Sequence, residues 1–454
     1  MEWTIWFFYN CLFAIGYFLI LPRFLLRMWR RGGYLPSFSQ RFGIYDKSVA
    51  EKLSAMPARF LIHAVSVGEI QIATRFMAEL RARRPGTAFV LTTTTSTAHA
   101  LAAKTMNPDD ILLYFPVDFP FIVRRALRQI NPAGLILVES ELWPNMVRQM
   151  AARKGKIMLL NGRISNRSFR RYALVRPLVR RVLAYFDLLC AQSSEDGRRL
   201  IDLGADPARV KASGSAKYDI ADSSFKADES FTGKLQSLGF TAPNEVLVGG
   251  STWPGEETVL LEIFTGLCGR YPGLRLVLVP RHAERRKQVM EEIRRSNLDF
   301  MLWSECRESA PMITDKKEAK VLLVDTTGEL KAFYSVATIV FIGKSLTARG
   351  GQNPIEAAVF SKPIITGPHM ENFSGVMADF LESEAIVQVN DRRALEETLF
   401  NLLGDENKRK LLGERARQVV LKKSGALRAS VVFFANCISS RSETDLPSGK
   451  KQPL

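Results

Sequence analysis

The sequence contains few residues of the kinds that build disulfide frameworks and metal sites. Its 454 residues include five cysteines and four histidines, namely Cys11, Cys190, Cys268, Cys306, Cys437, His63, His99, His282 and His369. The cysteines show no CxxC spacing, and their odd number argues against a disulfide framework. The histidines show no HExxH spacing, so a metal site would need carboxylates alone. We expect a reducing compartment, no structural zinc and no metal cofactor.

Two nucleotide-binding signatures are also absent from the glycine turns in the second half of the chain. Neither GxxxxGK[ST] nor GxGxxG occurs at these turns. The first string holds phosphates in P-loop NTPases, and the second marks dinucleotide-binding folds. The sequence therefore supports neither a P-loop NTPase nor an NAD-dependent enzyme.

The composition is that of a globular protein with an uneven charge. Hydrophobic residues make up 46% of the chain and charged residues 24%, and the length suits two domains. The net charge is +17, and residues 1–220 hold 32 lysines and arginines against 16 acids. The remainder holds 31 against 30. The first half is therefore expected to face a polyanion, which can be nucleic acid, an anionic membrane or a phosphorylated substrate.

The amino terminus favours the membrane over nucleic acid. Residues 3–21 are almost wholly apolar and approach the ~20 residues that a membrane span needs. Glu2 and the aromatic run at 13–18 do not suit a cleavable signal peptide. Residues 1–31 are therefore expected to be an uncleaved anchor.

Basic residues follow this anchor directly and set its expected orientation. They are Arg23, Arg27, Arg30 and Arg31. By the positive-inside bias they place the body of the protein in the cytoplasm. A helix that lies in the membrane interface, continued by Phe24, Leu25 and Trp29, stays open as an alternative to a spanning helix.

Residues 32–220 alternate between strand and helix patterns. Strands are predicted at 60–65, 89–94, 111–114, 135–138, 157–160 and 188–191, with helical patterns such as 75–84 and 146–153 between them. The alternation predicts a parallel, doubly wound sheet. Polar turns follow the strands, so Glu69, Glu139 and Glu141 are expected to converge at one edge of that sheet.

The stretch from Leu61 to Glu69 changes from a strand pattern to a helix pattern. Residues 59–65 have the length and apolar content of a buried strand, and from Ile70 onwards apolar residues recur at helical spacing. Such a turn lies at the carboxyl end of the sheet, where α/β folds bind ligands. We interpret Glu69 as the reactive group. The alternative is that Glu69 merely complements the positive end of a helix.

A second unusual string is Glu139-Ser140-Glu141-Leu142-Trp143-Pro144-Asn145. It predicts a loop that opens a helix at Pro144. We assign a functional role to Glu139. Glu141 is interpreted as an acid in the first turn of that helix, and Trp143 as a packing residue.

Seven arginines and no acid lie between residues 163 and 181. They are Arg163, Arg167, Arg170, Arg171, Arg176, Arg180 and Arg181. Interleaved apolar residues make the segment amphipathic, which suits a membrane surface or the binding of phosphates by arginine forks. The alternative is a solvated helix face, as in most charge runs. The missing acids weigh against that alternative.

Residues 221–425 repeat the alternation. Strands are predicted at 246–249, 275–279, 321–324, 338–342, 363–366 and 386–389, and helices near 256–268, 283–296, 329–335, 354–360, 374–382 and 392–403. Two doubly wound domains in tandem imply a cleft between them. Residues 426–454 are expected to form a C-terminal helix and a disordered tail.

Turns of this second domain suit anions. Ser251 lies in a Gly-Gly-Ser-Thr turn with open backbone N–H groups, and Arg281 follows the next strand. Gly343, Lys344 and Ser345 follow a third strand, and residues 349–354 lead into a helix whose amino end suits a phosphate. Glu356 in its first turn is expected to reach a pair of sugar hydroxyls. Each turn alone is more often structural, but their recurrence at strand ends predicts a nucleotide site.

Six strings occur along the chain in one order. They are His63-Ala64-Val65-Ser66-Val67-Gly68-Glu69, Glu139 to Asn145, Asn161-Gly162-Arg163-Ile164-Ser165, Gly214-Ser215-Ala216-Lys217-Tyr218-Asp219, Pro280-Arg281-His282 and Arg349 to Ala358. In this order they resemble the lipid A Kdo transferases of Gram-negative bacteria, where Kdo is 3-deoxy-D-manno-octulosonic acid. The resemblance implies a GT-B fold of two Rossmann-like domains with an interdomain cleft. It also implies transfer of Kdo from CMP-Kdo, with inversion, to the lipid A precursor (lipid IVA) at the cytoplasmic face of the inner membrane.

The resemblance implies roles for residues as well. Glu69 matches the family's proposed base, which takes the proton from the acceptor hydroxyl, and a helix start favours the ionised form that a base requires. Glu139 and Lys217 match further catalytic positions. The expected donor-binding residues are Ser251, Arg281, Gly343, Lys344, Ser345, Asn353 and Glu356, and the expected acceptor-binding residues are Ser66, Gly68, Arg163, Arg167, Arg170 and Arg171. CMP leaves with one phosphate, so no metal is expected.

Two other functions stay open. One is a GT-B glycosyltransferase or epimerase that acts on a UDP-sugar. The other is a membrane-tethered polyanion-binding protein without catalysis, which leaves the carboxylates at the strand ends without a purpose. The number of Kdo units transferred and the oligomeric state do not follow from the sequence.

Overall fold

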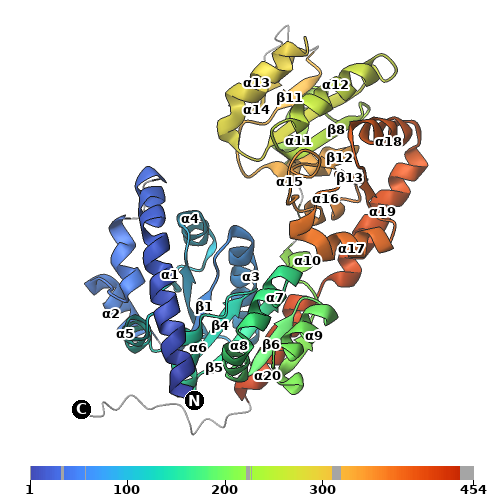
Figure 1. The fold of residues 1–454 in the computed structure, drawn as a ribbon. Helices are drawn as coiled ribbons and strands as arrows, with labels where there is room; N and C mark the ends of the chain where they lie inside the picture. Colours follow the sequence, from blue (N-terminus) through green and yellow to red (C-terminus); the bar gives the residue numbers. More distant parts are fainter. Residues whose placement is uncertain are drawn as a thin grey trace. The chain divides into compact units, whose positions relative to one another are not determined.

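The computed structural model describes residues 2–31, 35–56, 58–220, 225, 227–308 and 319–439 (Figure 1). The expected disordered tail was 439–454; Ser439 ends a helix, and residues 440–454 lie outside the described residues. The side chains of Arg23, Arg27, Arg30 and Arg31, and those of Phe24, Leu25 and Trp29, also lie outside them. The chain divides into two compact units, one of residues Met1–Ile220 with Ser424–Leu454 and one of residues Ala221–Lys423.

The first unit is built on a parallel seven-stranded sheet in the order β3-β2-β1-β4-β5-β6-β7. The strands are β1 (Arg59–His63), β2 (Ala88–Thr93), β3 (Ile111–Tyr114), β4 (Gly134–Val138), β5 (Lys156–Gly162), β6 (Leu188–Ala191) and β7 (Val210–Ala212). The predicted doubly wound sheet is thus confirmed, and its order reverses between β1 and β4. The sequence did not reveal β7, because this edge strand is short and largely exposed.

Helices cover both faces of this sheet. They are α1 (Glu2–Arg31), α2 (Lys47–Ala55), α3 (Val67–Arg83), α4 (Ser96–Thr105), α5 (Pro120–Ile130), α6 (Pro144–Ala152), α7 (Asn166–Leu174), α8 (Arg176–Ala184), α9 (Ser194–Asp202), α10 (Lys217–Ile220) and α20 (Ala426–Ser439), with 3-10 turns at Leu35–Phe42 and Pro207–Arg209. Alternate strand residues point to opposite faces, so Leu61 belongs to one core cluster and Ile62 to the other.

The C-terminal helix α20 belongs to the core of the first unit. The ring of Phe434 lies 5.3 Å from that of Phe60 and 6.1 Å from that of Phe76. Asp219 accepts hydrogen bonds from the backbone N–H groups of Gly425 and Leu427 at the start of α20. The sequence predicted this helix but not its place. Long-range apolar packing on α3, rather than any local signal, brings the chain back.

The second unit repeats the architecture with the strand order β10-β11-β9-β8-β12-β13-β14, and every pair is parallel. The strands are β8 (Val246–Thr252), β9 (Arg275–Pro280), β10 (Phe300–Leu302), β11 (Val321–Leu323), β12 (Ile339–Ile342), β13 (Ile364–Thr366) and β14 (Val387–Gln388). Strand β10, a three-residue edge strand, was not predicted. The order reverses between β8 and β12.

The helices of the second unit mostly match the predicted ranges. They are α11 (Glu229–Ser237), α12 (Glu256–Cys268), α13 (Arg286–Arg295), α14 (Trp303–Glu308), α15 (Leu330–Val336), α16 (Ile355–Ala358), α17 (Ser374–Glu382), α18 (Arg392–Gly404) and α19 (Glu406–Lys423), with 3-10 turns at Ala283–Arg285 and Glu371–Phe373. Helix α16 is shorter than the predicted 354–360, and this shortness bears on anion binding.

Candidate active site

The predicted catalytic carboxylates lie where the strand order of the first sheet reverses. Glu69 follows β1 in the first turn of α3, and Glu139 follows β4, the neighbouring strand on the other side of the reversal. Open parallel sheets bind ligands outside the carboxyl ends of their strands at this point. The convergence expected from the sequence is therefore observed for these two residues.

Glu69 is buried and held by the turn that precedes its helix. Its Oε2 accepts a hydrogen bond of 2.8 Å from the Val65 N–H, and its own N–H donates to Oγ of Ser66, the N-cap of α3. Burial raises the pKa of the Glu69 carboxyl, and the charge of Glu139 adds to that effect against the hydrogen bonds. The hydrogen bonds of this turn favour the ionised carboxylate, but desolvation outweighs them in the direction of the shift.

Lys217 pairs with Glu139. The Lys217 Nζ lies 3.8 Å from Oε1 of Glu139. Burial and the charge of Arg163 lower the pKa of the Lys217 amine, while Glu139 and Glu69 oppose that effect. The structure thus brings the three predicted catalytic residues and the predicted acceptor residue Arg163 into one electrostatic cluster.

Asn161, at the end of β5, joins the two segments of this pair. Its Oδ1 accepts a 2.9 Å hydrogen bond from the Ala216 N–H, next to Lys217, and its Nδ2 lies 3.5 Å from Oε1 of Glu139. Asn161 and Glu139 both have positive φ angles, 56° and 62°. Such backbone strain costs ~1–3 kcal/mol for each residue and is typical of functional sites.

Glu141 belongs to the same cluster, contrary to its interpretation as a first-turn acid. Helix α6 begins at Pro144 with Trp143 as its N-cap, so Glu141 lies outside the helix. Burial and the charges of Glu69 and Glu139 raise the pKa of Glu141 to about 7. Trp143 packs on the rings of Phe115 and His63, as predicted.

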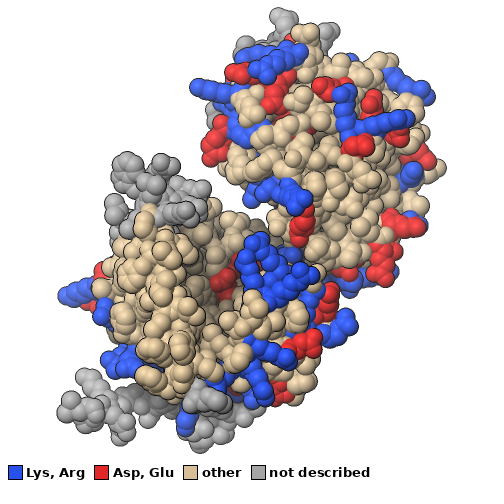
Figure 2. All heavy atoms as spheres, viewed as in Figure 1, with Lys and Arg blue, Asp and Glu red and all other residues tan. Residues whose placement is uncertain are grey.

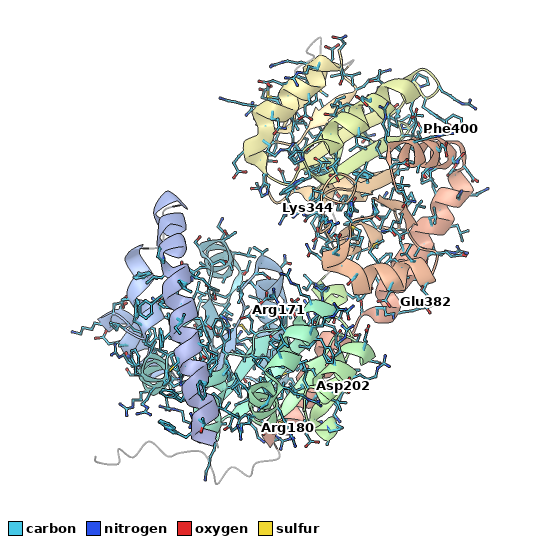
Figure 3. The ribbon with its side chains drawn as sticks, in the orientation of Figure 1. Arg171, Arg180, Asp202, Lys344, Glu382 and Phe400 are labelled. Atoms are coloured by element: carbon cyan, nitrogen blue, oxygen red, sulfur yellow. The ribbon has the colours of Figure 1, made fainter. Side chains whose placement is uncertain are left out.

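The arginine run forms α7 and α8. Arg167, Arg170 and Arg171 are exposed on α7 and make no ion pair with any residue that the structure describes. Figure 2 shows arginine and lysine side chains gathered over α7, and Figure 3 labels Arg171 there. The Tyr172 hydroxyl of α7 donates a 3.3 Å hydrogen bond to the Ser140 carbonyl, which fastens this helix to the loop that carries Glu139.

The two remaining acceptor-binding predictions concern the turn before α3. Ser66 caps the helix, so its side chain has a structural task. Gly68 is exposed, and a Cβ at this position would meet no atom within 4 Å in the described structure. Packing within the unit therefore does not explain this glycine.

In the second unit, packing does explain two glycines of the predicted anion turns. A Cβ at Gly250 would lie 2.1 Å from the Tyr334 hydroxyl, and a Cβ at Gly343 would lie 2.5 Å from the Ser251 carbonyl oxygen. Ser251 and Lys344 follow these glycines with φ angles of 55° and 54°. The ends of β8 and β12 thus approach closely at the strand-order reversal.

The buried carboxylate of Glu256, at the start of α12, accepts hydrogen bonds from the backbone N–H groups that follow β12. It accepts hydrogen bonds from the backbone N–H groups of Lys344 (2.7 Å), Ser345 (2.8 Å), Leu346 (2.9 Å) and Trp253 (2.9 Å). The Ser345 hydroxyl is also buried and accepts from the Gly367 N–H. These groups are not available to a phosphate, so the side chain of Lys344 is the part of the loop that can contact one.

Two N–H groups of the loop before α16 are also taken by side chains. The Gly350 N–H donates to Glu371 at 2.7 Å, and the Ile355 N–H donates to Oδ1 of Asn353 at 3.1 Å. Helix α16 has four residues, so its dipole is small. A phosphate site at its amino end stays a prediction, and the short helix contributes little to it.

Side chains near this loop remain suited to a nucleotide. Arg281 is exposed at the end of β9 and lies close enough to Glu356 to favour its ionised form. Burial nevertheless raises the pKa of the Glu356 carboxyl. Asn353 Nδ2 lies 3.3 Å from Oε1 of Glu356, and the Lys344 Nζ lies 4.6 Å from the Trp253 ring centre. Figure 3 labels Lys344 in this unit.

Sequence reasoning missed two residues of these sites, Asn161 and Glu256. Both act through hydrogen bonds to segments far away in the chain, so no local pattern identifies them. Glu141 was expected at this sheet edge, and only its interpretation as an acid of the first helical turn is wrong. Among the residues that the structure describes, no group of three or more histidine, cysteine or acidic residues has the geometry to hold a metal ion.

The comparisons with known proteins agree with the two-unit architecture. Residues 36–220 match the family model described as 3-Deoxy-D-manno-octulosonic-acid transferase (kdotransferase). The 3-deoxy-D-manno-octulosonic acid transferase of Haemophilus influenzae is 30% identical over 425 residues, which are 93% of this chain and 96% of that protein. The enzyme of that name from Bordetella pertussis is 30% identical over 427 residues, 91% of this chain and 95% of that protein.

A solved structure supports the fold. The putative UDP-N-acetylglucosamine 2-epimerase of Listeria monocytogenes covers 87% of this chain and 99% of its own, with a TM-score of 0.58 at 13% identity. That identity shows the fold alone, which is GT-B. With the match to full-length relatives at 30% identity, the chain belongs to the 3-deoxy-D-manno-octulosonic acid transferase family of glycosyltransferases.

Proposed function

We propose that the protein transfers Kdo from CMP-Kdo to a lipid A precursor by direct displacement, with inversion at the anomeric carbon and Glu69 as general base. The observation that carries the mechanism is the buried Glu69 carboxylate at the strand-order reversal, held by the Val65 N–H beside Glu139. Family membership supplies the class of reaction.

A raised pKa suits a base. A carboxylate whose pKa lies closer to the working pH has a stronger tendency to take the proton of a sugar hydroxyl. A positioned base contributes ~100- to 10,000-fold to the rate. Lys217 offsets the negative charge that Glu69 and Glu139 place together, so that Glu69 is ionised when the acceptor binds.

On the donor side, side-chain cations hold the phosphate. Arg281 and Lys344 follow β9 and β12, and both carry positive charge toward the end of the second sheet. We assign the ribose hydroxyls to Asn353 and Glu356, and the 3.3 Å separation of Asn353 Nδ2 and Glu356 Oε1 supports a shared role. These cations neutralise the single phosphate of the departing CMP, and the mechanism therefore needs no metal ion.

On the acceptor side, arginines that follow β5 and lie on α7 bind the phosphates of the lipid A precursor. Arg163, Arg167, Arg170 and Arg171 supply the charge, and guanidinium forks suit phosphate. The apolar helix α1 keeps the enzyme at the cytoplasmic face of the inner membrane, where a lipid acceptor is available.

The experiment compares Glu69→Gln with Glu79→Gln, an acid on the same helix. We expect Glu69→Gln to bind CMP-Kdo as the unmodified protein does, but to lose transfer by at least ~100-fold. Calorimetry measures binding, and mass spectrometry of the lipid product measures transfer. Normal turnover of Glu69→Gln would exclude Glu69 as the base. Binding of UDP-N-acetylglucosamine instead of CMP-Kdo by the unmodified protein would favour a UDP-sugar enzyme.

A further inference from the structure

Helix α1 has two different long faces. One face contains Trp6, which is 3% exposed, and the partly buried residues Tyr9, Asn10, Phe13 and Tyr17. The other face is apolar and exposed, and includes Trp3, Phe7, Phe8, Leu12, Ile15, Phe18, Leu19 and Ile20, each at least 49% exposed. The stretch Trp3–Pro22 has a mean hydropathy of 1.8, which by length and composition permits a membrane span.

The inner face of α1 is fastened to the body of the first unit along much of this length. The Tyr9 hydroxyl donates a 2.8 Å hydrogen bond to Asp118, and Asn145 Nδ2 donates a 2.8 Å bond to the side chain of Asn10. The guanidinium of Arg148 lies 4.6 Å from the centre of the Trp6 ring.

Ring contacts continue this docked face toward the C-terminal part of α1. The ring centres of Phe13 and Tyr17 lie 5.2 and 5.4 Å from that of Phe119, the N-cap of α5. The contacts therefore run from Trp6 to Tyr17, about 17 Å of helix at 1.5 Å per residue.

A helix fastened in this way cannot also cross the membrane. A span would place Trp6 to Tyr17 inside the hydrocarbon layer, which is ~30 Å thick. The elements that contact this stretch would follow it, together with the exposed Arg148 of α6 and the arginines of α5. Arginine at the depth of lipid tails is strongly unfavourable. The contacts therefore favour a helix that lies along the membrane surface.

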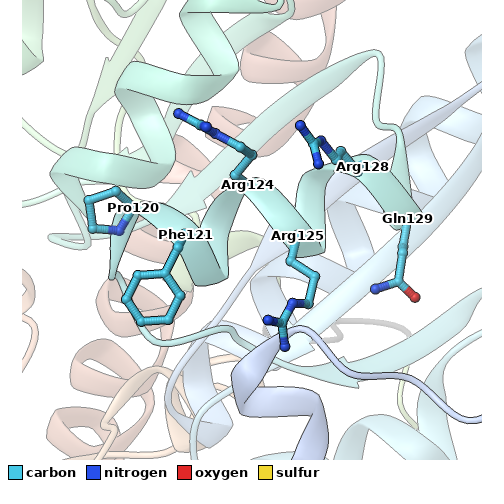
Figure 4. A pocket seen from close by; sticks show the side chains of 6 residues that line it. All are labelled: Pro120, Phe121, Arg124, Arg125, Arg128 and Gln129. Atoms are coloured by element: carbon cyan, nitrogen blue, oxygen red, sulfur yellow. The ribbon is translucent and has the colours of Figure 1, made fainter. Parts of the chain in front are cut away.

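Helix α5 borders α1 and carries the complementary charge. Its exposed Phe121 stacks on Phe119, and Arg124, Arg125 and Arg128 line a hollow of about 540 Å³ with Phe121 (Figure 4). In Figure 4, Arg124 and Arg128 point to one side of α5, and Phe121 and Arg125 to the other. Helix α5 contains no acid, and these arginines make no ion pair within the described part of the chain.

We infer that α1 lies in the plane of an anionic bilayer, with its exposed apolar face among the acyl chains and Arg124, Arg125 and Arg128 against lipid phosphates at its edge. Apolar burial together with charge attraction is the means by which interfacial helices bind. Residues 3–22 of α1 include no charged residue, and the surface over this part of the helix is largely free of charged side chains in Figure 2, as insertion requires. The inference rests on the proposed membrane location but not on the sugar chemistry.

The side of the membrane on which the amino terminus lies distinguishes a helix in the membrane plane from a spanning helix. The full chain carries an epitope at its amino terminus and is produced in Gram-negative cells. We expect protease to remove the epitope in inside-out vesicles but not in intact spheroplasts, because both ends of α1 stay on the cytoplasmic side. Removal in intact spheroplasts would show a spanning helix and overturn the inference.

Vesicle binding tests the arginines. The variant Arg124→Glu/Arg125→Glu/Arg128→Glu is compared with Lys408→Glu/Arg417→Glu/Lys422→Glu, which makes the same charge change on exposed residues of α19. With phosphatidylcholine vesicles that contain phosphatidylglycerol, we expect the α5 variant to bind on the order of tenfold or more weakly and the α19 variant to bind normally. Equal binding by both variants would show that the arginines of α5 do not contribute to the membrane-binding surface.

A stable dimer that fails to bind vesicles would assign the apolar face to a second copy of the chain. Transfer to a detergent-dispersed acceptor, measured on the same preparations, tests the proposed function separately.

Discussion

The Nζ of Lys217 lies 3.8 Å from Oε1 of Glu139, and each side chain is one-fifth exposed. The two residues follow different strands of the first sheet, β7 and β4, and Asn161 of β5 holds both segments in place. The charge of Lys217 also acts on Glu69. This cation therefore balances a site in which several acids are close together.

Replacement of Lys217 by Met is expected to impair the base. Loss of the cation makes ionisation of Glu69 less favourable, so the acid limb of the kcat against pH profile moves to higher pH. At neutral pH we expect kcat to fall on the order of tenfold or more. Lys217→Arg keeps the charge and is the control for the position of the limb. An unchanged kcat against pH profile in Lys217→Met would show that Lys217 does not influence the ionisation of Glu69.

Glu141→Gln is expected to change how stability depends on pH. The folded-state pKa of about 7 exceeds the ordinary 4.5, so the stability linked to Glu141 is fully present below pH 4.5 and is lost as the pH rises through 7. The loss is on the order of 3 kcal/mol. The glutamine variant should therefore unfold at higher urea concentration than the unmodified protein at pH 8, but not at pH 4. The exposed Glu51→Gln is the control, and an identical pH slope in both variants would contradict the assignment.

Glu256→Gln is expected to weaken binding of the donor. The amide places N–H donors against the N–H groups of Lys344 to Leu346, which leaves buried groups unpaired at ~1–3 kcal/mol and shifts Lys344. We expect CMP to bind about tenfold more weakly, with KM for CMP-Kdo raised and kcat changed less. Glu262→Gln, on the exposed side of the same helix, serves as the control. Normal CMP affinity in Glu256→Gln would limit this residue to a role in packing.

Reversal of charge on α7 tests the acceptor site. In Arg170→Glu/Arg171→Glu we expect the KM for the lipid acceptor to rise on the order of tenfold while the KM for CMP-Kdo stays unchanged, because these exposed arginines have no acid partner among the described residues. Arg198→Glu/Lys211→Glu changes two exposed cations elsewhere in the same unit and should leave both constants unchanged. An unaltered KM for the lipid acceptor in the α7 variant would support the alternative that the arginine run is a solvated helix face without a role in binding.

Local patterns in the sequence determined much of the fold. Buried parallel strands such as β4 are short apolar runs, so twelve strands could be predicted from the sequence alone. The change of period after β1 likewise marks the start of α3. The edge strands β7 and β10 were not predicted, because three residues at a sheet edge do not form a recognisable apolar run. The position of Glu69 followed from the same change of period.

Tertiary structure alone decided which groups are available for chemistry. The turn after β12 reads as a phosphate site in the sequence, yet Glu256, far away in the chain, fills its N–H groups. The raised pKa of Glu69 depends on burial and on Glu139, which no local pattern reports. The apolar sequence of α1 permits a membrane span, but Asp118 and Phe119 fasten one of its faces to the first unit. Periodicity is a property of neighbouring residues, whereas desolvation and hydrogen-bond partners depend on segments that meet only after folding.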